Sequence, residues 1–126
     1  MTEMRFDDAT LDRLRVEREV RIETRSAKDG TPHRAIIWVV VDDAGRALIR
    51  SWRGAGARWY REATGGAPVR LIVGGQEIPV EIARATDSER VASCSRELEA
   101  KYAGNPATKS MVREEVLDTT LEVVPA

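Results

Sequence analysis

Arginine gathers in one segment of this sequence, and arginine is the residue type best suited to binding phosphate. The segment Ala44–Arg61 contains five arginines and no acidic residue. Arg50 and Arg53 stand on either side of Ser51 and next to the glycine-containing loop 52–56. A guanidinium offers paired donors to phosphate oxygens, and a serine hydroxyl and loop N–H groups can complete the site. The segment therefore predicts an anion site, with surface ion pairing of the same arginines as the alternative.

Other side chains capable of chemistry are few. The chain has one histidine and one cysteine, which are too few for an internal disulfide or a conventional His/Cys metal centre. His33 could supply a proton, because an imidazole titrates near neutral pH, or it could cap the turn after Pro32 or start a strand. Cys94 is predicted to be a small buried side chain. We therefore assign no catalytic residue and no metal ligand from the sequence.

Two of the three tryptophans occupy positions where a flat ligand could be covered. Trp52 and Trp59 each lie beside glycine or arginine in a segment that cannot be fully buried, and an aromatic ring there can cover a flat ring system. Packing is the alternative for at least one of them. Trp38 lies inside an apolar run, which favours a place in the core.

The arginine segment must be positioned by strands. Residues 36–41 form an unbroken apolar run, which predicts a strand covered on both faces. Asp43 and Gly45 predict a tight turn after it, followed by an antiparallel strand over 47–51. Residues 20–25 alternate apolar and polar side chains and predict a further strand.

The second half of the chain contains three further predicted strands. Residues 69–73 and 76–85 surround Gly74-Gly75, a strong hairpin signal, and 119–124 predict a last strand. Pro79 cannot donate to a ladder, so we expect its strand, or at least that residue, at a sheet edge.

Three helices are predicted between the strands. Acidic residues and a threonine precede a short helix near residue 11, and a second short helix begins near Arg58. The capping-box spacing of Thr86 and Glu89 predicts a longer helix up to Tyr102. Residues 109–116 remain open between helix and loop.

Composition limits the class of protein. With 126 residues, 42% of them hydrophobic, we expect a single domain over residues 1–126. A formal charge of -1 argues against a nucleic-acid or membrane binder, since both normally need a basic excess. No run approaches the roughly 18 apolar residues of a membrane helix. Cysteine usage and the absence of a leader-like segment favour a cytoplasmic location.

Six short strands joined mainly as hairpins, with three helices, predict a curled sheet, because curling protects exposed edges. The fold expected is mainly β with α: a six-stranded antiparallel split β-barrel with three short to medium helices.

Residues spread along the chain match a known pattern: Thr24, Lys28, Gly30, Pro32, Arg34, residues 37–41, Arg50-Ser51, Gly54, residues 59–61, Gly74-Gly75, Lys101-Tyr102 and residues 119–121. With these residues the sequence resembles a family of small uncharacterised bacterial proteins within the flavin and deazaflavin split-barrel superfamily. The likeness extends over nearly the whole chain.

The resemblance implies an FMN or a deazaflavin, or occasionally haem or another cofactor, in a groove at the interface of a homodimer. In such proteins, basic and hydroxyl residues of the central hairpin and the following loop hold the cofactor phosphate. The expected function is that of a flavin- or deazaflavin-binding oxidoreductase-like protein. The alternative is a non-enzymatic dimeric barrel that binds another phosphorylated ligand or acts as an interaction module. The cofactor-binding residues that the resemblance implies are Thr24, Arg34, Trp38, Arg50, Ser51, Arg53 and Trp59.

Overall fold

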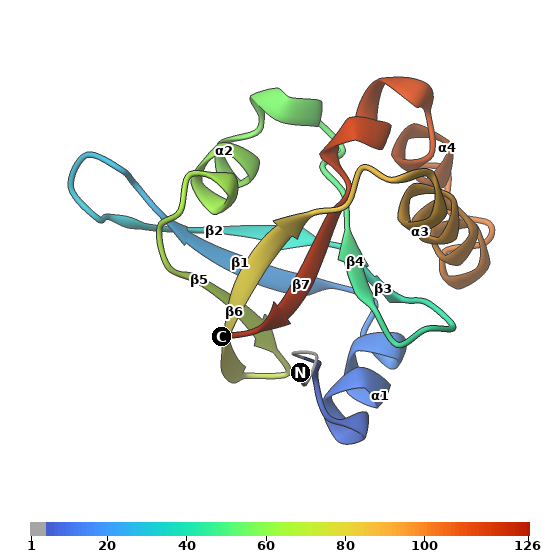
Figure 1. The fold of residues 1–126 in the computed structure, drawn as a ribbon, viewed down its shortest axis with the longest axis horizontal. Helices are drawn as coiled ribbons and strands as arrows, with labels where there is room; N and C mark the ends of the chain where they lie inside the picture. The colour runs from blue at the N-terminus through green and yellow to red at the C-terminus, as the bar shows by residue number, and fades with distance from the viewer. Residues whose placement is uncertain (1–4) are drawn as a thin grey trace.

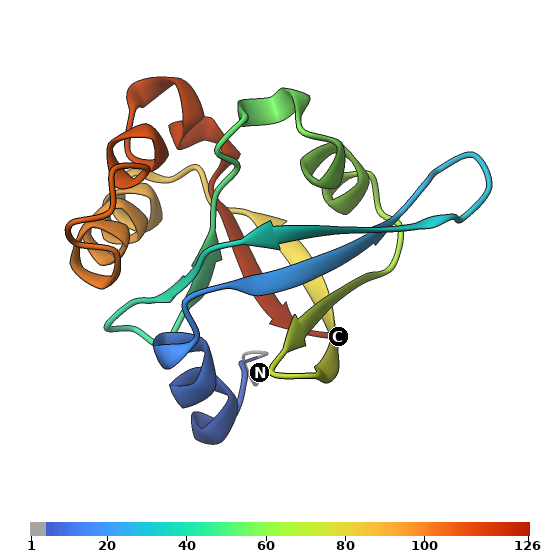
Figure 2. The same cartoon turned by 180° about the vertical axis from the view of Figure 1, so that it is seen from behind.

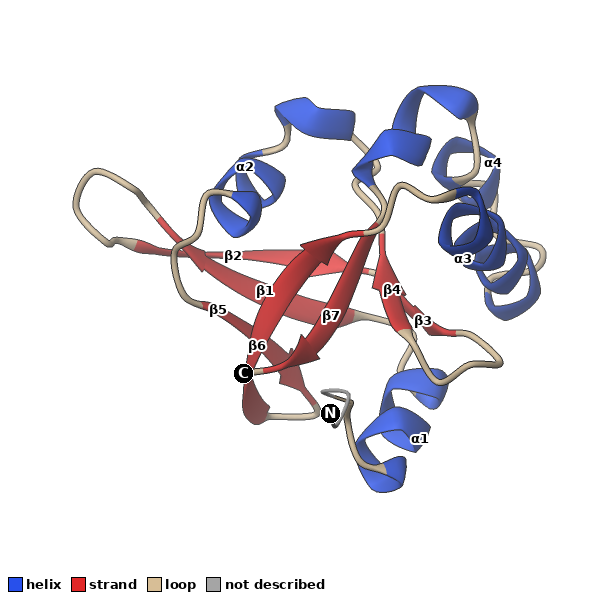
Figure 3. Cartoon of the chain, viewed as in Figure 1, coloured by secondary structure: helices blue, strands red, loops and turns tan. Residues whose placement is uncertain are grey.

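The computed structural model describes residues 5–126, which form seven β-strands, four α-helices and two 3-10 helices (Figures 1 and 3). The strands are β1 (Val20–Arg25), β2 (Pro32–Ile37), β3 (Val39–Val41), β4 (Ala47–Ile49), β5 (Val69–Val73), β6 (Gln76–Arg84) and β7 (Leu121–Pro125). The helices are α1 (Asp8–Val16), η1 (Gly54–Gly56), α2 (Arg58–Thr64), α3 (Ser88–Lys101), α4 (Thr108–Met111) and η2 (Glu114–Thr119). Within these residues, no helix has the length and apolar character needed to cross a lipid bilayer.

The strands form one antiparallel sheet in the order β2-β1-β5-β6-β7-β4-β3. β2 and β3 therefore lie at opposite edges, although Trp38 alone separates them along the chain. The sheet must curl until its two edges meet at Trp38, and Figure 2 shows this curled, half-closed barrel. The predicted single strand over 36–41 is thus two strands, because β2 pairs with β1 whereas β3 pairs with β4. The predicted number of six strands is corrected to seven.

The apolar run has two different environments on either side of the break. Val39 and Val41 belong to the main core inside the sheet, and Val40 belongs to a second core with Leu98 of α3. β3 is therefore buried on both faces, as predicted. The prediction was wrong for Ile36, which is 57% exposed because β2 is an edge strand.

Side-chain caps start the first and third helices. The Asp7 carboxylate accepts a hydrogen bond from the Thr10 N–H at 2.8 Å and caps α1. Asp87 does the same for α3 through the N–H of Arg90, so the N-cap lies one residue after the predicted Thr86. Both caps satisfy a backbone donor that has no partner within the helix.

The strand that contains Pro79 is an interior strand, so the expectation of an edge was wrong for the strand, although Pro79 itself lies outside its pairing with β7. β6 lies between β5 and β7, but its pairing with β7 begins only at Val80. Pro79 thus precedes the first residue paired with β7, where the lack of an N–H costs little. The open region 109–116 contains α4 and the start of η2.

Candidate functional site

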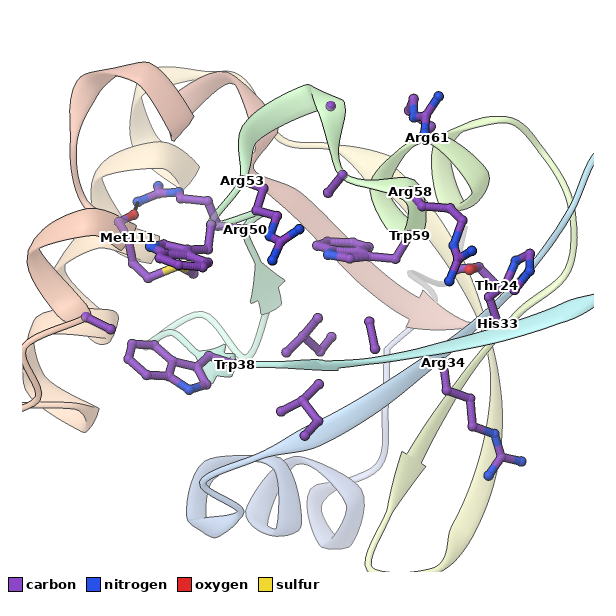
Figure 4. A pocket seen from close by; sticks show the side chains of 17 residues that line it. Thr24, His33, Arg34, Trp38, Arg50, Arg53, Arg58, Trp59, Arg61 and Met111 are labelled. Carbon is purple, nitrogen blue, oxygen red and sulfur yellow. Dashed lines mark hydrogen bonds between the residues drawn. The ribbon is translucent and has the colours of Figure 1, made fainter.

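A cavity of about 590 Å³ lies between the edge strand β2 and the segment that follows β4 (Figure 4). One wall is formed by residues 33–38 and the other by residues from Arg50 to Arg61, with α4 contributing Met111. The cavity is therefore located where the curled sheet is split. Its volume lies within the range of about 300–1,000 Å³ that is typical of small-molecule sites.

The charged groups around this cavity have one sign. The lining contains five arginines and, among the described residues, no aspartate or glutamate. Arg53 and Arg58 are exposed, and neither guanidinium donates a hydrogen bond within residues 5–126. Figure 4 shows Arg53 reaching toward Trp59, whereas Arg61 lies apart from that space. Two guanidiniums are thus available to an anionic ligand.

Arg50 has a different environment. It is 1% exposed, and its guanidinium donates to the hydroxyls of Thr120 and Ser95 at 2.9 Å each. It also donates to the carbonyls of Met111 at 3.1 Å and Val91 at 3.0 Å. Burial lowers the pKa of this guanidinium, because the charged form is poorly solvated there. Arg50 lines the cavity, but four of its N–H groups hold β4 against α3, α4 and the start of β7.

Ser51 shapes the loop beside the cavity. Its side chain is fully buried, and its hydroxyl donates to the Gly54 carbonyl at 2.7 Å while the Gly54 N–H donates back to the Ser51 carbonyl at 3.1 Å. The Ser51 N–H donates to the Thr119 hydroxyl at 3.0 Å. Gly54 has a φ of +73°, a conformation that L side chains rarely adopt. These contacts hold in place the turn that contains Arg53 and precedes α2.

Two of the residues predicted to bind a cofactor, Arg34 and Trp38, make contacts within the fold instead. Arg34 donates from Nε to Glu23 at 3.1 Å, and in Figure 4 its guanidinium lies on the side of β2 opposite His33. The Trp38 ring stacks on Tyr102 with centroids 3.8 Å apart and planes 6° from parallel. Both residues border the cavity, but their polar or aromatic groups also serve the fold.

Two further tryptophans lie at the cavity, as their sequence context suggested. Trp59 is half-buried, contacts the edge of Tyr60 at 6.0 Å between centroids, and projects into the cavity in Figure 4. Trp52 lines the cavity as well and is 53% exposed. The pair provides an aromatic surface next to the free guanidiniums.

Thr24 belongs to a small polar cluster at one end of the cavity. Its hydroxyl donates to Glu62 Oε1 at 2.8 Å, and His33 Nδ1 lies 3.1 Å from both Glu62 oxygens. Burial opposes ionisation of Glu62, but the hydrogen bonds from His33 and Thr24 and the nearby charge of Arg58 outweigh it. The pKa of Glu62 is therefore below its usual value.

The sequence did not identify Arg58 or Glu62 as residues of the site. Their i,i+4 spacing on α2, which puts both on one helix face, is the signal that could have done so. For Arg46 the alternative reading of the arginine segment, ion pairing, is correct. Its guanidinium bonds Asp42 at 2.8 Å and Glu89 at 3.0 Å. Arg46 does not line the cavity. Residues 5–126 contain no cluster of three or more His, Cys, Asp or Glu side chains suited to a metal ion.

Solved structures share this fold at low sequence identity. A proposed pyridoxamine 5′-phosphate oxidase from Listeria innocua matches with a TM-score of 0.64 and 15% identity over 94% of this chain and 91% of that one. An F420-H2-dependent reductase matches with 0.62 and 15% over 86% and 94%. A FAD- and haem-binding protein from Mycobacterium smegmatis matches with 0.58 and 18% over 96% and 66%.

These likenesses show that the chain shares the split-barrel fold of these proteins. No curated protein matches the sequence. A family described as uncharacterised protein conserved in bacteria, DUF2255, matches residues 10–123, nearly the whole chain. The chain belongs to this bacterial family.

Proposed function

We propose that the cavity binds a flavin-type cofactor, FMN or a deazaflavin, and that the protein is an oxidoreductase. The observation that carries the proposal is that two guanidiniums beside an aromatic wall, those of Arg53 and Arg58, donate no hydrogen bond within residues 5–126. The structural neighbours include an F420-H2-dependent reductase and a FAD- and haem-binding protein, which supports the same class of ligand.

The residues present suit such a cofactor. A phosphate needs several donors, and Arg53 and Arg58 can supply them without first breaking a hydrogen bond within the described residues. A flat ring system needs an apolar surface, which Trp59 and Ile37 offer. When bound, the cofactor would supply hydride or electron transfer. The protein would contribute binding, orientation and exclusion of water.

Each residue predicted from the sequence has a role in this proposal. Arg53 binds the phosphate and Trp59 covers the ring. Arg50 and Ser51 are positioning residues, because their polar atoms bond the protein and hold the loop that carries Arg53. Trp38 and the backbone of Arg34 border the ligand, and Thr24 orients Glu62.

We also propose that the protein is a homodimer and that the partner covers the open side of the cavity. Two of the large apolar side chains most exposed to solvent, Ile36 at 57% and Trp52 at 53%, both line this cavity. β2 also presents a free sheet edge beside them. Exposed apolar groups at the rim of a cavity are typical of an interaction surface. We also propose that the protein is cytoplasmic, because its buried free cysteine, Cys94, fits a reducing compartment.

A titration of the purified protein with FMN and with a deazaflavin tests the proposed function. We expect the protein to quench the fluorescence of at least one of them and the ligand to raise the melting temperature. Removing both side chains in Arg53→Ala/Arg58→Ala should weaken binding at least tenfold, since a hydrogen bond to a charged group contributes about 1.5–3 kcal/mol. Arg61→Ala is the matched control, because Arg61 is an exposed arginine on the helix of Arg58 that belongs to the lining but whose side chain lies apart from Arg53 and Trp59 in Figure 4.

Other results would point elsewhere. If neither flavin nor deazaflavin binds, the oxidoreductase proposal fails. If pyridoxal phosphate or inorganic phosphate then binds and the double variant loses it, the alternative of another phosphorylated ligand is correct. If the double variant and Arg61→Ala bind the cofactor equally well, the two guanidiniums are not the phosphate site.

A further inference from the structure

His33 forms part of the cavity wall at the end where β2 and α2 meet, and Glu62 of α2 supports it from outside the lining. His33 Nδ1 lies 3.1 Å from both carboxylate oxygens of Glu62, and Thr24 donates to the same carboxylate at 2.8 Å. The His33 side chain is 25% exposed and that of Glu62 is 13% exposed. The carboxylate is thus held under the imidazole, which itself remains open to the cavity.

This arrangement decides which ring nitrogen carries a proton. Hydrogen bonds from His33 and Thr24 keep Glu62 ionised despite its partial burial, and an ionised carboxylate only accepts hydrogen bonds. Nδ1 must therefore be the nitrogen that carries hydrogen. Nε2 makes no hydrogen bond within residues 5–126, so it is a lone pair in the neutral ring and a free N–H in the protonated ring.

His33 differs in type from the other ionisable side chains that line the cavity among residues 5–126. The remaining charged groups of the lining are arginines, which stay protonated in proteins. The hydroxyl of Thr24 already donates to Glu62. His33 is also the only histidine of the chain. A proton that a reaction in this cavity takes up must therefore come from His33 or from water.

We propose that His33, oriented by Glu62, is the proton donor and acceptor of this cavity, and that it serves a substrate that takes up a hydride and a proton across a polarised double bond. This inference rests on the proposed function, whose reduced cofactor is the hydride source and is oxidised by two electrons. The Nε2–H bond of the protonated ring breaks, its electron pair stays on Nε2, and the proton passes to the substrate atom that hydride uptake makes electron-rich. The reverse direction takes a proton back onto Nε2.

The geometry also separates this pair from a hydrolytic triad. In a triad, a nucleophile hydroxyl donates to the histidine, and an acidic residue orients the ring from the other side. Here the Thr24 hydroxyl donates to the carboxylate, so no nucleophile is paired with His33. Glu62 is a positioning residue, which selects the tautomer and the ring orientation. The charged groups near His33 are Glu62 and Arg58 of α2, while β1 contributes the uncharged Thr24.

The state of the ring can be measured in the protein without cofactor. With one histidine, a histidine-labelled sample gives a single set of imidazole ¹⁵N signals. We expect the neutral ring to carry its proton on Nδ1, and diethyl pyrocarbonate to add one group at Nε2. Glu62→Gln should give a mixture of tautomers, because an amide can donate as well as accept. Glu77→Gln, a surface carboxylate paired with Arg70, is the control and should leave the signals unchanged.

A neutral ring protonated on Nε2, or an imidazole that diethyl pyrocarbonate does not modify, overturns the proposal whatever the cofactor. If a cofactor binds, it should shift the Nε2 signal and protect the ring from modification; an unchanged signal overturns the proposal while the proposed function stands. If no cofactor binds, the proposed function fails, and the tautomer and reactivity of the free protein alone decide whether His33 is a proton site.

The proton transfer itself is tested with reduced cofactor and 2-cyclohexenone. His33→Gln should bind the cofactor within about twofold of the original protein but reduce the enone about 10²-fold more slowly, the usual size of a general-acid contribution. If His33 had only a structural role, His33→Gln would change the stability of the protein but would reduce the enone about as fast as the original protein. Equal rates in the two proteins overturn the proposal.

Discussion

At the scale of single residues, similar arginines have dissimilar tasks. Arg50 is buried and bonds four neutral acceptors, whereas Arg53, three positions later, is exposed and bonds none within the described residues. Loss of these hydrogen bonds would cost folding free energy, because the buried guanidinium and the carbonyls that it bonds would be left without partners. Arg50 is therefore a residue of the core, and Arg53 is available to a ligand.

We predict that Arg50→Ala lowers the free energy of unfolding by about 2–5 kcal/mol, because it removes four hydrogen bonds and leaves a void. Arg53→Ala should change it by no more than about 0.5 kcal/mol, as expected for an exposed side chain. Urea denaturation of both variants measures the difference. Equal stability of the two would contradict the core role of Arg50.

At the scale of elements, one carboxylate joins the β3–β4 hairpin to α3. Asp42 Oδ1 accepts from the N–H groups of Ala44 and Arg46, and Oδ2 accepts from Arg46 Nε at 2.8 Å and the Ser93 hydroxyl at 3.0 Å. The sequence suggested Asp43 for the turn, but Asp43 is exposed. Burial opposes ionisation of Asp42, yet these hydrogen bonds and the charge of Arg46 lower its pKa overall.

This lowered pKa gives a pH dependence whose sign is defined. The unfolded carboxyl titrates near pH 4, so the stability from the ionised form is fully present above that pH and is lost as pH falls through the lower folded pKa. We predict that Asp42→Asn costs about 1–3 kcal/mol at pH 7 and flattens the loss of stability in acid. Denaturant titrations from pH 7 to pH 2 measure both effects. Asp43→Asn is the control, and identical acid profiles for the two variants would disprove this role of Asp42.

At the scale of the whole molecule, the two sheet edges meet at one residue and then separate. Trp38 joins β2 to β3, and its ring stacks on Tyr102 at the end of α3. The cavity lies on the side where the edges separate. The apolar rim there is the surface on which our dimer proposal rests.

We predict that the protein is a dimer in solution and that Ile36→Asp converts it to a monomer, because a charge at this rim would be buried without a partner. Val16 of α1 is 72% exposed but does not line the cavity, so Val16→Asp should remain dimeric. Light scattering after size-exclusion chromatography measures the mass of each. A monomeric original protein, or a dimeric Ile36→Asp, would reject this interface.

Local signals in the sequence were enough to predict most elements. Alternation in residues 20–25, the Gly74-Gly75 turn and the capping-box spacing before α3 each depend on residues a few positions apart. Gly74 and Gly75 have φ values of +55° and +85°, which glycine adopts at no steric cost. Such short-range preferences do not need the rest of the molecule, so the hairpins and helices could be assigned without it.

Only the tertiary structure decided what the arginines and the histidine do. Arg50 bonds residues 41–70 positions away, and His33 meets Glu62 29 positions away. The break at Trp38 likewise follows from pairing with two strands at opposite edges of the sheet. Burial and pairing over such separations depend on how the sheet curls, which no local pattern specifies. The sequence determined which groups were available, and the curl of the sheet determined which of them face the cavity.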